Sequence, residues 1–180
     1  MGIRTGLEVT IEITSYCPHY CNYCSTNAGP KGKHLSYERI LKFLESLEDI
    51  DRINISGGEP LSHPKFYDIL NLCYKITNDV RVYTNAIKHI IFNSDIIKEI
   101  TIEANVCIAP GHIVWIPEKA DKIHLLKLVH QGRAKNIPEK EIVVSHNFEM
   151  DCTHDCKKCL NILLQADGQV VSSPCKKKYR

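Results

Sequence analysis

The sequence lacks a long apolar run, a strong net charge, internal repeats and a low-complexity linker. A helix needs about 20 apolar residues to cross a bilayer, and no stretch of the chain approaches that length. The start of the chain has no apolar core before Glu8 and Glu12, so we expect neither a membrane span nor a signal peptide. A formal net charge of +2 argues against a nucleic-acid partner. These absences favour one globular domain with at most a small appendage.

Cysteine, by contrast, is abundant and unevenly distributed. Seven of the nine cysteines fall in two clusters, three within Cys17–Cys24 and four within Cys152–Cys175. A disulfide framework would be spread through an extracellular chain, whereas thiols stay reduced in the cytoplasm and cluster there around metals. The two clusters therefore predict two metal sites in a cytoplasmic protein. Cys73 and Cys107 stand alone, and the apolar neighbours of Cys73 indicate a small core residue.

Residues 1–150 show strands alternating with helices, which predicts an α/β fold with a parallel sheet. Runs rich in β-branched residues predict strands at 7–14, 52–56, 80–84, 99–105, 122–130 and 141–145. Helical periodicity predicts helices at 37–48, 64–77 and 90–98. Six strands with only three helices predict a partial, pared-down (β/α)6 barrel, open on the side where helices are missing. An open side would suit a large substrate such as a peptide or an RNA loop.

Residues 151–180 predict a second, smaller element. Apolar segments on either side of Asp167-Gly168 indicate a β-hairpin with a two-residue turn. A hairpin of this size is not stable alone in water, so we expect a metal at its base to stabilise it. The candidate ligands are Cys152, Cys156, Cys159 and Cys175.

The first cluster has the spacing Cys17-x3-Cys21-x2-Cys24, which supplies three thiolates. An iron–sulfur cubane has four irons and normally one thiolate for each. Three thiolates would leave one iron open to a ligand that the protein does not supply. This vacancy predicts that a small molecule binds at the cluster.

Loops that follow the strands of an α/β barrel build its active site. The cysteine loop, Gly57–Pro60, Thr84–Ala86 and Asn105–Cys107 all follow predicted strands, so we expect them to converge. Glycines at 57 and 58 let the backbone approach a ligand closely. An amino group there would be bound by the glycine carbonyls or by Glu59.

These segments resemble the motifs of the radical S-adenosylmethionine (SAM) superfamily. The three cysteines, with Tyr23 between the second and third, resemble its cluster loop. Gly57–Pro60 resembles its methionine-binding Gly-Gly-Glu-Pro motif after strand two. Tyr83–Ala86 is similar to its Thr-Asn-Gly segment, with Ala86 in place of glycine. The resemblance covers about residues 7–147.

The resemblance implies an enzyme in which Cys17, Cys21 and Cys24 hold a 4Fe–4S cluster and SAM binds the open iron. Reductive cleavage of SAM would give a 5′-deoxyadenosyl radical that abstracts hydrogen from a peptide or small-molecule substrate. The electron would come from a donor such as ferredoxin or flavodoxin. Cys107 is a weak catalytic candidate, with packing as the alternative. The residues expected to contact SAM are Tyr23, Gly57, Gly58, Glu59, Pro60, Asn85, Glu103, Asn105 and Arg133.

The second cluster resembles the short auxiliary-cluster elements called SPASM and Twitch. The resemblance implies a second 4Fe–4S cluster, although two Cys-x2-Cys-like arms also suit tetrahedral zinc. If Cys152 is not a ligand, an open iron there could bind substrate. An alternative interpretation of the whole chain is a non-catalytic iron–sulfur or zinc protein for electron transfer or nucleic-acid binding. Gly57–Pro60 argues against it, because such a module has no use for a methionine-binding turn.

Overall fold

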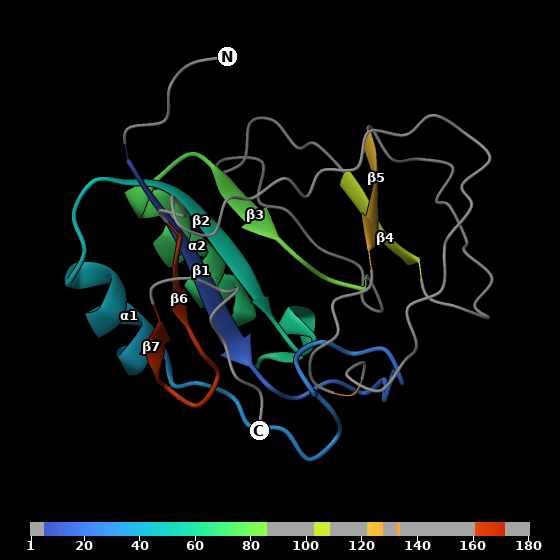
Figure 1. Ribbon diagram of the computed structural model, residues 1–180. Coiled ribbons are helices and arrows are strands. Elements are labelled where there is room, and N and C mark those ends of the chain that lie inside the picture. The colour runs from blue at the N-terminus through green and yellow to red at the C-terminus, as the bar shows by residue number, and fades with distance from the viewer. Residues whose placement is uncertain (1–5, 86–102, 109–121, 128–132, 134–160, 172–180) are drawn as a thin grey trace.

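The computed structural model describes residues 6–85, 103–108, 122–127, 133 and 161–171 (Figure 1). Its elements in chain order are β1 (Leu7–Thr14), α1 (Tyr37–Glu45), β2 (Ile50–Gly57), the 3-10 helix η1 (Pro60–Ser62), α2 (Phe66–Ile76), β3 (Val80–Val82), β4 (Glu103–Ile108), β5 (Lys122–Lys127), β6 (Asn161–Leu164) and β7 (Val170–Val171). The helix expected at 90–98 and the strand expected at 141–145 lie outside the described residues.

The main sheet has five strands in the order β3-β2-β1-β6-β7, with β1 at its centre. β1 pairs in parallel with β2 and with β6, and β2 pairs in parallel with β3. β4 and β5 form a separate parallel pair (Figure 1). The predicted α/β fold with a parallel sheet is therefore confirmed. Closure of the strands into a partial barrel stays a prediction, because residues 86–102, between β3 and β4, lie outside the described residues.

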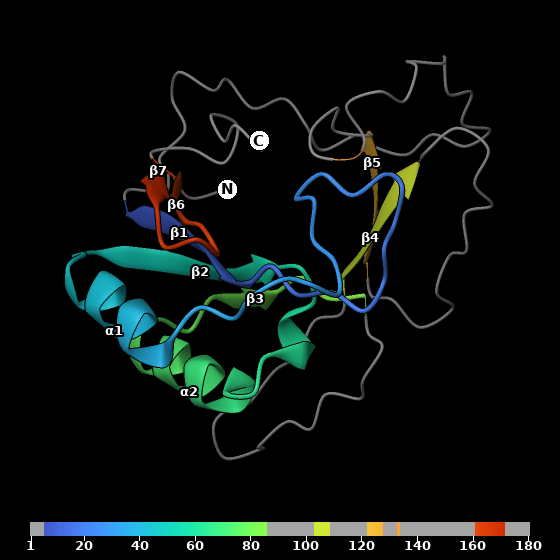
Figure 2. The same cartoon turned by 90° about the horizontal axis from the view of Figure 1, so that it is seen from below.

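Both helices cover the same face of the sheet (Figure 2). Side chains alternate along a strand, so every second residue of β1 points at the helices. Val9, Ile11 and Ile13 are fully buried there, and they join one core with apolar residues of both helices. Cys73 of α2 belongs to this core, and its burial raises the pKa of its thiol to about 12. The thiol is protonated at neutral pH, in agreement with the packing role that its neighbours predict.

The helix boundaries differ slightly from those expected. α1 begins as predicted, with the Ser36 hydroxyl accepting a hydrogen bond from the Arg39 amide at 3.2 Å. It ends at Glu45 instead of residue 48, because the Ser46 hydroxyl donates to the carbonyl of Phe43 at 2.6 Å and Asp49 adopts a positive φ of 53°. Within the described part of the chain, neither helix is long and apolar enough to cross a membrane.

The hairpin predicted near the end of the chain is present, but it is part of the main sheet. Its turn has three residues instead of the predicted two, because the Gln165 amide donates to the carbonyl of Gln169 at 2.8 Å. β6 pairs with β1 from Glu8↔Asn161 to Ile11↔Leu164, and β7 returns antiparallel beside β6. Leu164 is fully buried and belongs to the core. Packing against β1 thus supplies stabilisation for which a metal was expected. The domain boundary predicted at residue 150 lies outside the described residues and stays a prediction.

Polar side chains on the other face of the sheet also hold β6 in place. The Asn54 amide donates to the Glu8 carboxylate at 2.7 Å and to the Thr10 hydroxyl at 3.3 Å. Thr10 in turn donates to the side-chain oxygen of Asn161 at 3.0 Å. From α1, the Arg39 guanidinium donates to the carbonyl of Gly168 in the hairpin turn at 2.8 Å. The hairpin is therefore fixed from both faces of the sheet.

We expect Leu164→Ala to lower the free energy of unfolding by about 2–5 kcal/mol, because it leaves a cavity in the core. Val170→Ala on β7 is the control, since Val170 is 48% exposed, and its effect should stay below about 0.5 kcal/mol. Urea unfolding followed by circular dichroism measures both. Equal, small effects would mean that the hairpin does not pack on β1.

Candidate functional site

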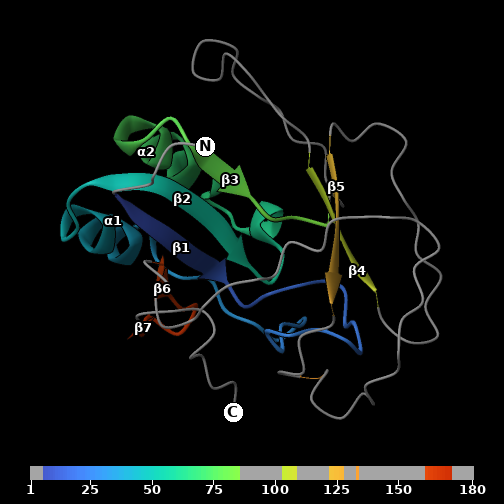
Figure 3. The same ribbon diagram turned by 45° about the horizontal axis from the view of Figure 1, so that its top comes forward.

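The loops that follow β1, β2 and β3 meet at the carboxyl edge of the main sheet, as predicted. The Gly58 amide donates to the carbonyl of Thr14 at 2.7 Å, and the Glu59 amide donates to the carbonyl of Tyr16 at 2.8 Å. From that edge the cysteine loop runs toward β4 and β5 (Figures 2 and 3). Convergence is therefore confirmed for three of the four expected loops. The fourth segment, 105–107, lies within β4, because this strand continues to Ile108.

The two glycines allow the loops after β1 and β2 to touch. A Cβ atom at Gly57 would overlap the carbonyl oxygen of Thr14, and one at Gly58 would overlap that of Tyr16. Gly57 also has a φ of +132°, a conformation that residues with side chains rarely adopt. We predicted that these glycines let the backbone approach a ligand. Their contacts show that they first let it approach the cysteine loop.

The Glu59 carboxylate joins the loops after β2 and β3. It is fully buried and accepts hydrogen bonds from the Leu61 amide at 2.9 Å, the Thr84 hydroxyl at 2.6 Å and the Asn85 amide at 3.0 Å. A buried carboxylate is tolerated only when such bonds replace water. This side chain is therefore engaged within the protein.

Asn85 connects this network to the thiols, because its side-chain amide lies 4.0 Å from the sulfur of Cys17. Cys17 is buried, and its pKa is raised above the ordinary thiol value. Burial is the largest cause, and the negative charges of Cys21, Glu59 and Cys24 raise the pKa further, while a backbone hydrogen bond at His19 lowers it. The sulfur of Cys17 is therefore buried beside the loop that follows β3.

The donor set fits an iron–sulfur cluster in its chemistry. Thiolates are the ligands of such clusters, and a bound metal would replace the proton that the surroundings of Cys17 favour. Among the described residues, no three cysteine, histidine or acidic side chains already form a closed metal site. Cys17 is buried in the loop, whereas Cys21 and Cys24 are partly exposed.

Arg133 contacts the cysteine loop itself. Its guanidinium donates to the carbonyl of Cys21 at 2.8 Å, the carbonyl of Ala28 at 2.6 Å and the side-chain oxygen of Asn27 at 3.2 Å. We predicted that Arg133 contacts a carboxylate of the cofactor. In the structure its guanidinium donates to oxygens of the cysteine loop instead. Backbone carbonyls carry no sequence signature, so no motif could have indicated these partners.

The remaining predicted residues are placed as follows. Tyr23 is partly buried in the cysteine loop, and Pro60 is the first residue of η1. Glu103, Asn105 and Cys107 lie in β4, where the structure describes the strand and not their side chains. Two predicted parts of the sites lie outside the described residues. They are Ala86 and the second cysteine cluster, which consists of Cys152, Cys156, Cys159 and Cys175.

Thr14 shapes the site without having been predicted to do so. The Thr14 hydroxyl accepts from the Tyr16 amide at 2.9 Å, donates to the carbonyl of Lys33 at 3.1 Å and lies 2.9 Å from Nδ1 of His34. It therefore ties the two ends of the cysteine loop together. The polar residue that ends an alternating strand was the only signal for Thr14.

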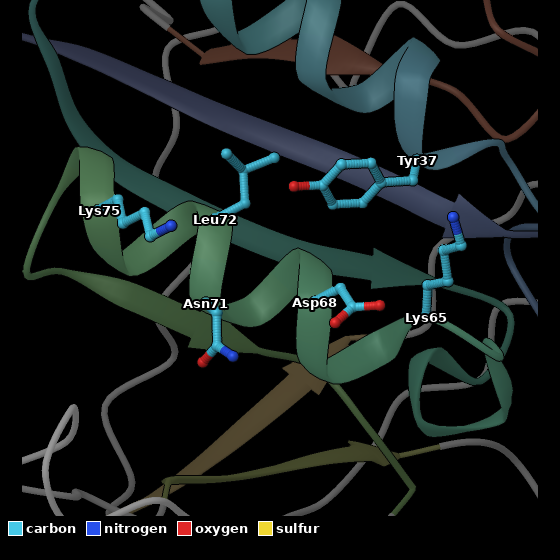
Figure 4. Close-up of a pocket in the computed structure, with 6 residues that line it drawn as sticks. All are labelled: Tyr37, Lys65, Asp68, Asn71, Leu72 and Lys75. Carbon is cyan, nitrogen blue, oxygen red and sulfur yellow. The ribbon is translucent and has the colours of Figure 1, made fainter.

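A hollow of about 290 Å³ lies on the helices and takes no part in this site (Figure 4). It contains residues of α1 and α2 and the residue before α2, and none from the three loops. Its lining is Tyr37, Lys65, Asp68, Asn71, Leu72 and Lys75.

Fold and site together define a parallel α/β protein with a thiol-bearing cofactor loop at the carboxyl edge of its sheet. The family model of the Radical SAM superfamily matches residues 11–128. This chain therefore belongs to the radical SAM superfamily, whose members use a 4Fe–4S cluster and SAM.

Curated relatives match shorter stretches. The chain is 35% identical over 85 residues to PqqA peptide cyclase of Bradyrhizobium diazoefficiens, covering 45% of this chain and 21% of that protein. It is 36% identical over 73 residues to molybdenum cofactor biosynthesis protein 1 of Homo sapiens, with coverage of 37% and 12%. It is 29% identical over 80 residues to the S-adenosylmethionine-dependent nucleotide dehydratase of Selenomonas ruminantium, with coverage of 43% and 29%. The matches thus span less than a third of each relative.

We expect Glu59→Gln to lower the free energy of unfolding by about 1–3 kcal/mol. Glutamine has the same shape, but its amide nitrogen is a donor and would replace one of the two accepting oxygens. In one orientation it would face the Leu61 amide and the Thr84 hydroxyl, and in the other the Asn85 amide. Glu45→Gln, on the exposed end of α1, is the matched control and should change stability by less than about 0.5 kcal/mol. Urea unfolding measures both variants, and equal effects would contradict the role of the Glu59 carboxylate.

Stability should also fall on acidification through His63. Its Nδ1 accepts from the Lys65 amide at 3.0 Å, so its Nε2 donates to the carbonyl of Leu35 at 2.9 Å and the ring is neutral. Burial lowers the pKa of His63. Below the ordinary pKa of about 6.5, the unfolded chain takes up a proton that the folded protein still rejects, so stability is lost as the pH falls.

His63→Gln should therefore lose less stability than the wild type between pH 7.5 and 5.5. The difference is at most about 1.4 kcal/mol for each pH unit below the ordinary pKa. Urea midpoints at the two pH values measure it. His19→Gln, at an exposed position of the cysteine loop, should keep the full wild-type loss, and the same flattening in both variants would refute the assignment.

Proposed function

We propose that this protein is a radical SAM enzyme that abstracts hydrogen from a peptide or small-molecule substrate. The observation that carries the proposal is the network joining the three loops whose motifs resemble the family's. The Glu59 carboxylate contacts Thr84 and Asn85, and the Asn85 side chain reaches the sulfur of Cys17. A protein that only stored a metal would need no such connection between the cysteine loop and the loops after β2 and β3.

In this proposal Cys17, Cys21 and Cys24 hold the 4Fe–4S cluster. When bound and reduced, the cluster would supply the electron that splits SAM into methionine and a 5′-deoxyadenosyl radical, which takes a substrate hydrogen. The chain's own residues bind and orient SAM. The carbonyls of Gly57–Glu59 would accept from its amino group, and Tyr23 would cover its adenine.

Other residues would line the rest of the cofactor site. Pro60 fixes the backbone as the turn enters η1, and Asn85 lies beside Cys17. Glu103 and Asn105 of β4 are proposed contacts to the ribose or carboxylate of SAM, and Cys107 of the same strand is a weaker candidate for donating hydrogen. The reduced thiols suit the cytoplasm, and the electron would come from a ferredoxin or flavodoxin.

The substrate class is proposed from the relatives' names and from the fold. One relative is named a peptide cyclase and another a nucleotide dehydratase, which favours a peptide first and a small molecule second. A partial barrel with an open side would admit a peptide, because a bulky substrate can cover the gap that a closed barrel would seal.

We also propose a second, auxiliary 4Fe–4S cluster held by the second group of cysteines, with zinc as the alternative metal. The direction of the hairpin strands supports it. The strand ends that lead to Cys159 and Cys175 both lie toward the amino-terminal end of β1, because β6 starts opposite Glu8 and β7 runs back along β6. The proposed ligands are Cys152, Cys156, Cys159 and Cys175.

Anaerobic reconstitution with iron and sulfide should give about eight irons per chain, because each cubane contains four. Addition of SAM and dithionite should then give methionine and 5′-deoxyadenosine, which chromatography with mass detection measures. Cys21→Ala should abolish the product, because it removes one ligand of the first cluster. Cys73→Ala is the control and should keep the product, since Cys73 lies in the core.

The two cluster proposals separate in the same experiment. Cys159→Ala should reduce the iron content to about four per chain while SAM cleavage continues. Bound zinc in place of half the iron would favour the zinc alternative for the second site. Iron near zero in the wild type, with no 5′-deoxyadenosine, would overturn the proposed function.

A further inference from the structure

We propose that Arg133 is a positioning residue that clamps the cysteine loop and raises the reduction potential of the cluster bound there. The effect on the potential rests on the proposed function, whereas the clamp is a property of the metal-free protein. Arg133 lies more than 100 residues from the loop in sequence, and it contacts the loop at several points.

The contacts enclose the part of the loop that carries two of the thiols. A backbone hydrogen bond from Cys17 to Gly29 closes the base of this part at 3.1 Å. Within it, the guanidinium reaches the carbonyls of Cys21 and Ala28, and the Arg133 amide donates to the carbonyl of Cys24 at 3.0 Å. Arg133 therefore fixes the backbone at both Cys21 and Cys24.

The guanidinium donates hydrogen bonds along its edge, and its flat face contacts an aromatic ring. Its central carbon lies 3.9 Å from the centre of the Tyr20 ring, in cation–π geometry. Gly29 also lies beside this ring, because an added Cβ there would lie only 3.0 Å from Tyr20 Cδ2 and 3.9 Å from Arg133 Nη1. Tyr20 is 66% exposed, so packing in the core does not hold it. The contact with Arg133 therefore accounts for the place of this exposed ring beside the loop.

Lysine could not replace these contacts. A guanidinium offers five N–H donors in a flat fork, whereas an ammonium is a compact charge without that fork. Three of the oxygens that Arg133 reaches lie on Cys21, Asn27 and Ala28. The geometry therefore requires arginine for shape as well as for charge.

The charge has its own consequence for a cluster in this loop. Reduction adds one negative charge to the cluster, and a nearby positive charge stabilises the reduced state. Hydrogen bonds and local charge are known determinants of the potential of such clusters. The Arg133 guanidinium donates directly to the main chain of a cluster ligand, Cys21. It therefore favours the reduced cluster.

The clamp is tested on the metal-free full chain by hydrogen–deuterium exchange of the segment 17–29. Arg133→Gln and Arg133→Lys should each speed exchange about tenfold or more, because several hydrogen bonds to a charged group are lost. Tyr20→Leu should give a smaller increase, since it removes only the stacked ring. Lys31→Gln, exposed in the same loop, is the control. Wild-type exchange in both Arg133 variants would overturn the clamp.

The potential is tested on the reconstituted protein by a redox titration of the cluster followed by electron paramagnetic resonance. Arg133→Gln should give a more negative midpoint than the wild type, and Arg133→Lys should stay closer to the wild type because it keeps the charge. Both variants should lose iron to a chelator about tenfold faster. An unchanged midpoint in Arg133→Gln would overturn the electrostatic role.

A third result would assign Arg133 to the cofactor instead. Weaker SAM binding in Arg133→Gln, with exchange, midpoint and iron loss all as in the wild type, would mean that the guanidinium contacts SAM and not the loop. If the wild type binds no iron, the proposed function fails while the exchange experiment still decides the clamp. The two failures are therefore distinguishable.

Discussion

The site depends on a close backbone contact between the end of β1 and the turn that follows β2. The amides of Gly58 and Glu59 donate to the carbonyls of Thr14 and Tyr16, and this approach is open only to residues without a Cβ at 57 and 58. It places the Glu59 carboxylate where it accepts hydrogen bonds from the Thr84 hydroxyl and the Asn85 amide. Removing the contact would separate all three loops, so the glycines matter for the protein's own assembly before any ligand binds.

The sheet fixes the position of that contact, because β1 is hydrogen-bonded to a neighbouring strand on each side. Its neighbour β2 fixes the turn at the carboxyl edge, and β6 fills the opposite side with Leu163 and Leu164. Strands β1, β2 and β3 run in parallel, so the loops after them leave at the same edge. The C-terminal hairpin thus stabilises the strand that carries the cysteine loop, although it lies more than 140 residues further along the chain.

Local sequence patterns predicted β1, β2 and β3, the capped start of α1 and the convergence of three loops, because each rests on periodicity or on a short motif. They did not predict that β6 pairs with β1, since alternation shows which residues face a core and not which strand is the neighbour. They also missed the hydrogen bonds from Arg133 to backbone carbonyls, because every residue has a carbonyl and no sequence pattern distinguishes the ones that are bound. The Gly-Gly-Glu-Pro motif indicated a ligand site, but the internal use of the Glu59 carboxylate depends on Thr84 and Asn85, which come from another loop.

The three thiols are unequal, which bears on how a cluster would assemble. Cys17 is buried, and its amide is bonded to the carbonyl of Gly29. Its raised pKa means that a metal must displace a proton there. Cys21 and Cys24 are more exposed than Cys17, and Arg133 donates a hydrogen bond to the backbone carbonyl of each. A backbone frame that is set before a ligand arrives lowers the entropy lost on binding. The contacts of Arg133 therefore prepare the loop around Cys21 and Cys24 before any ligand is bound.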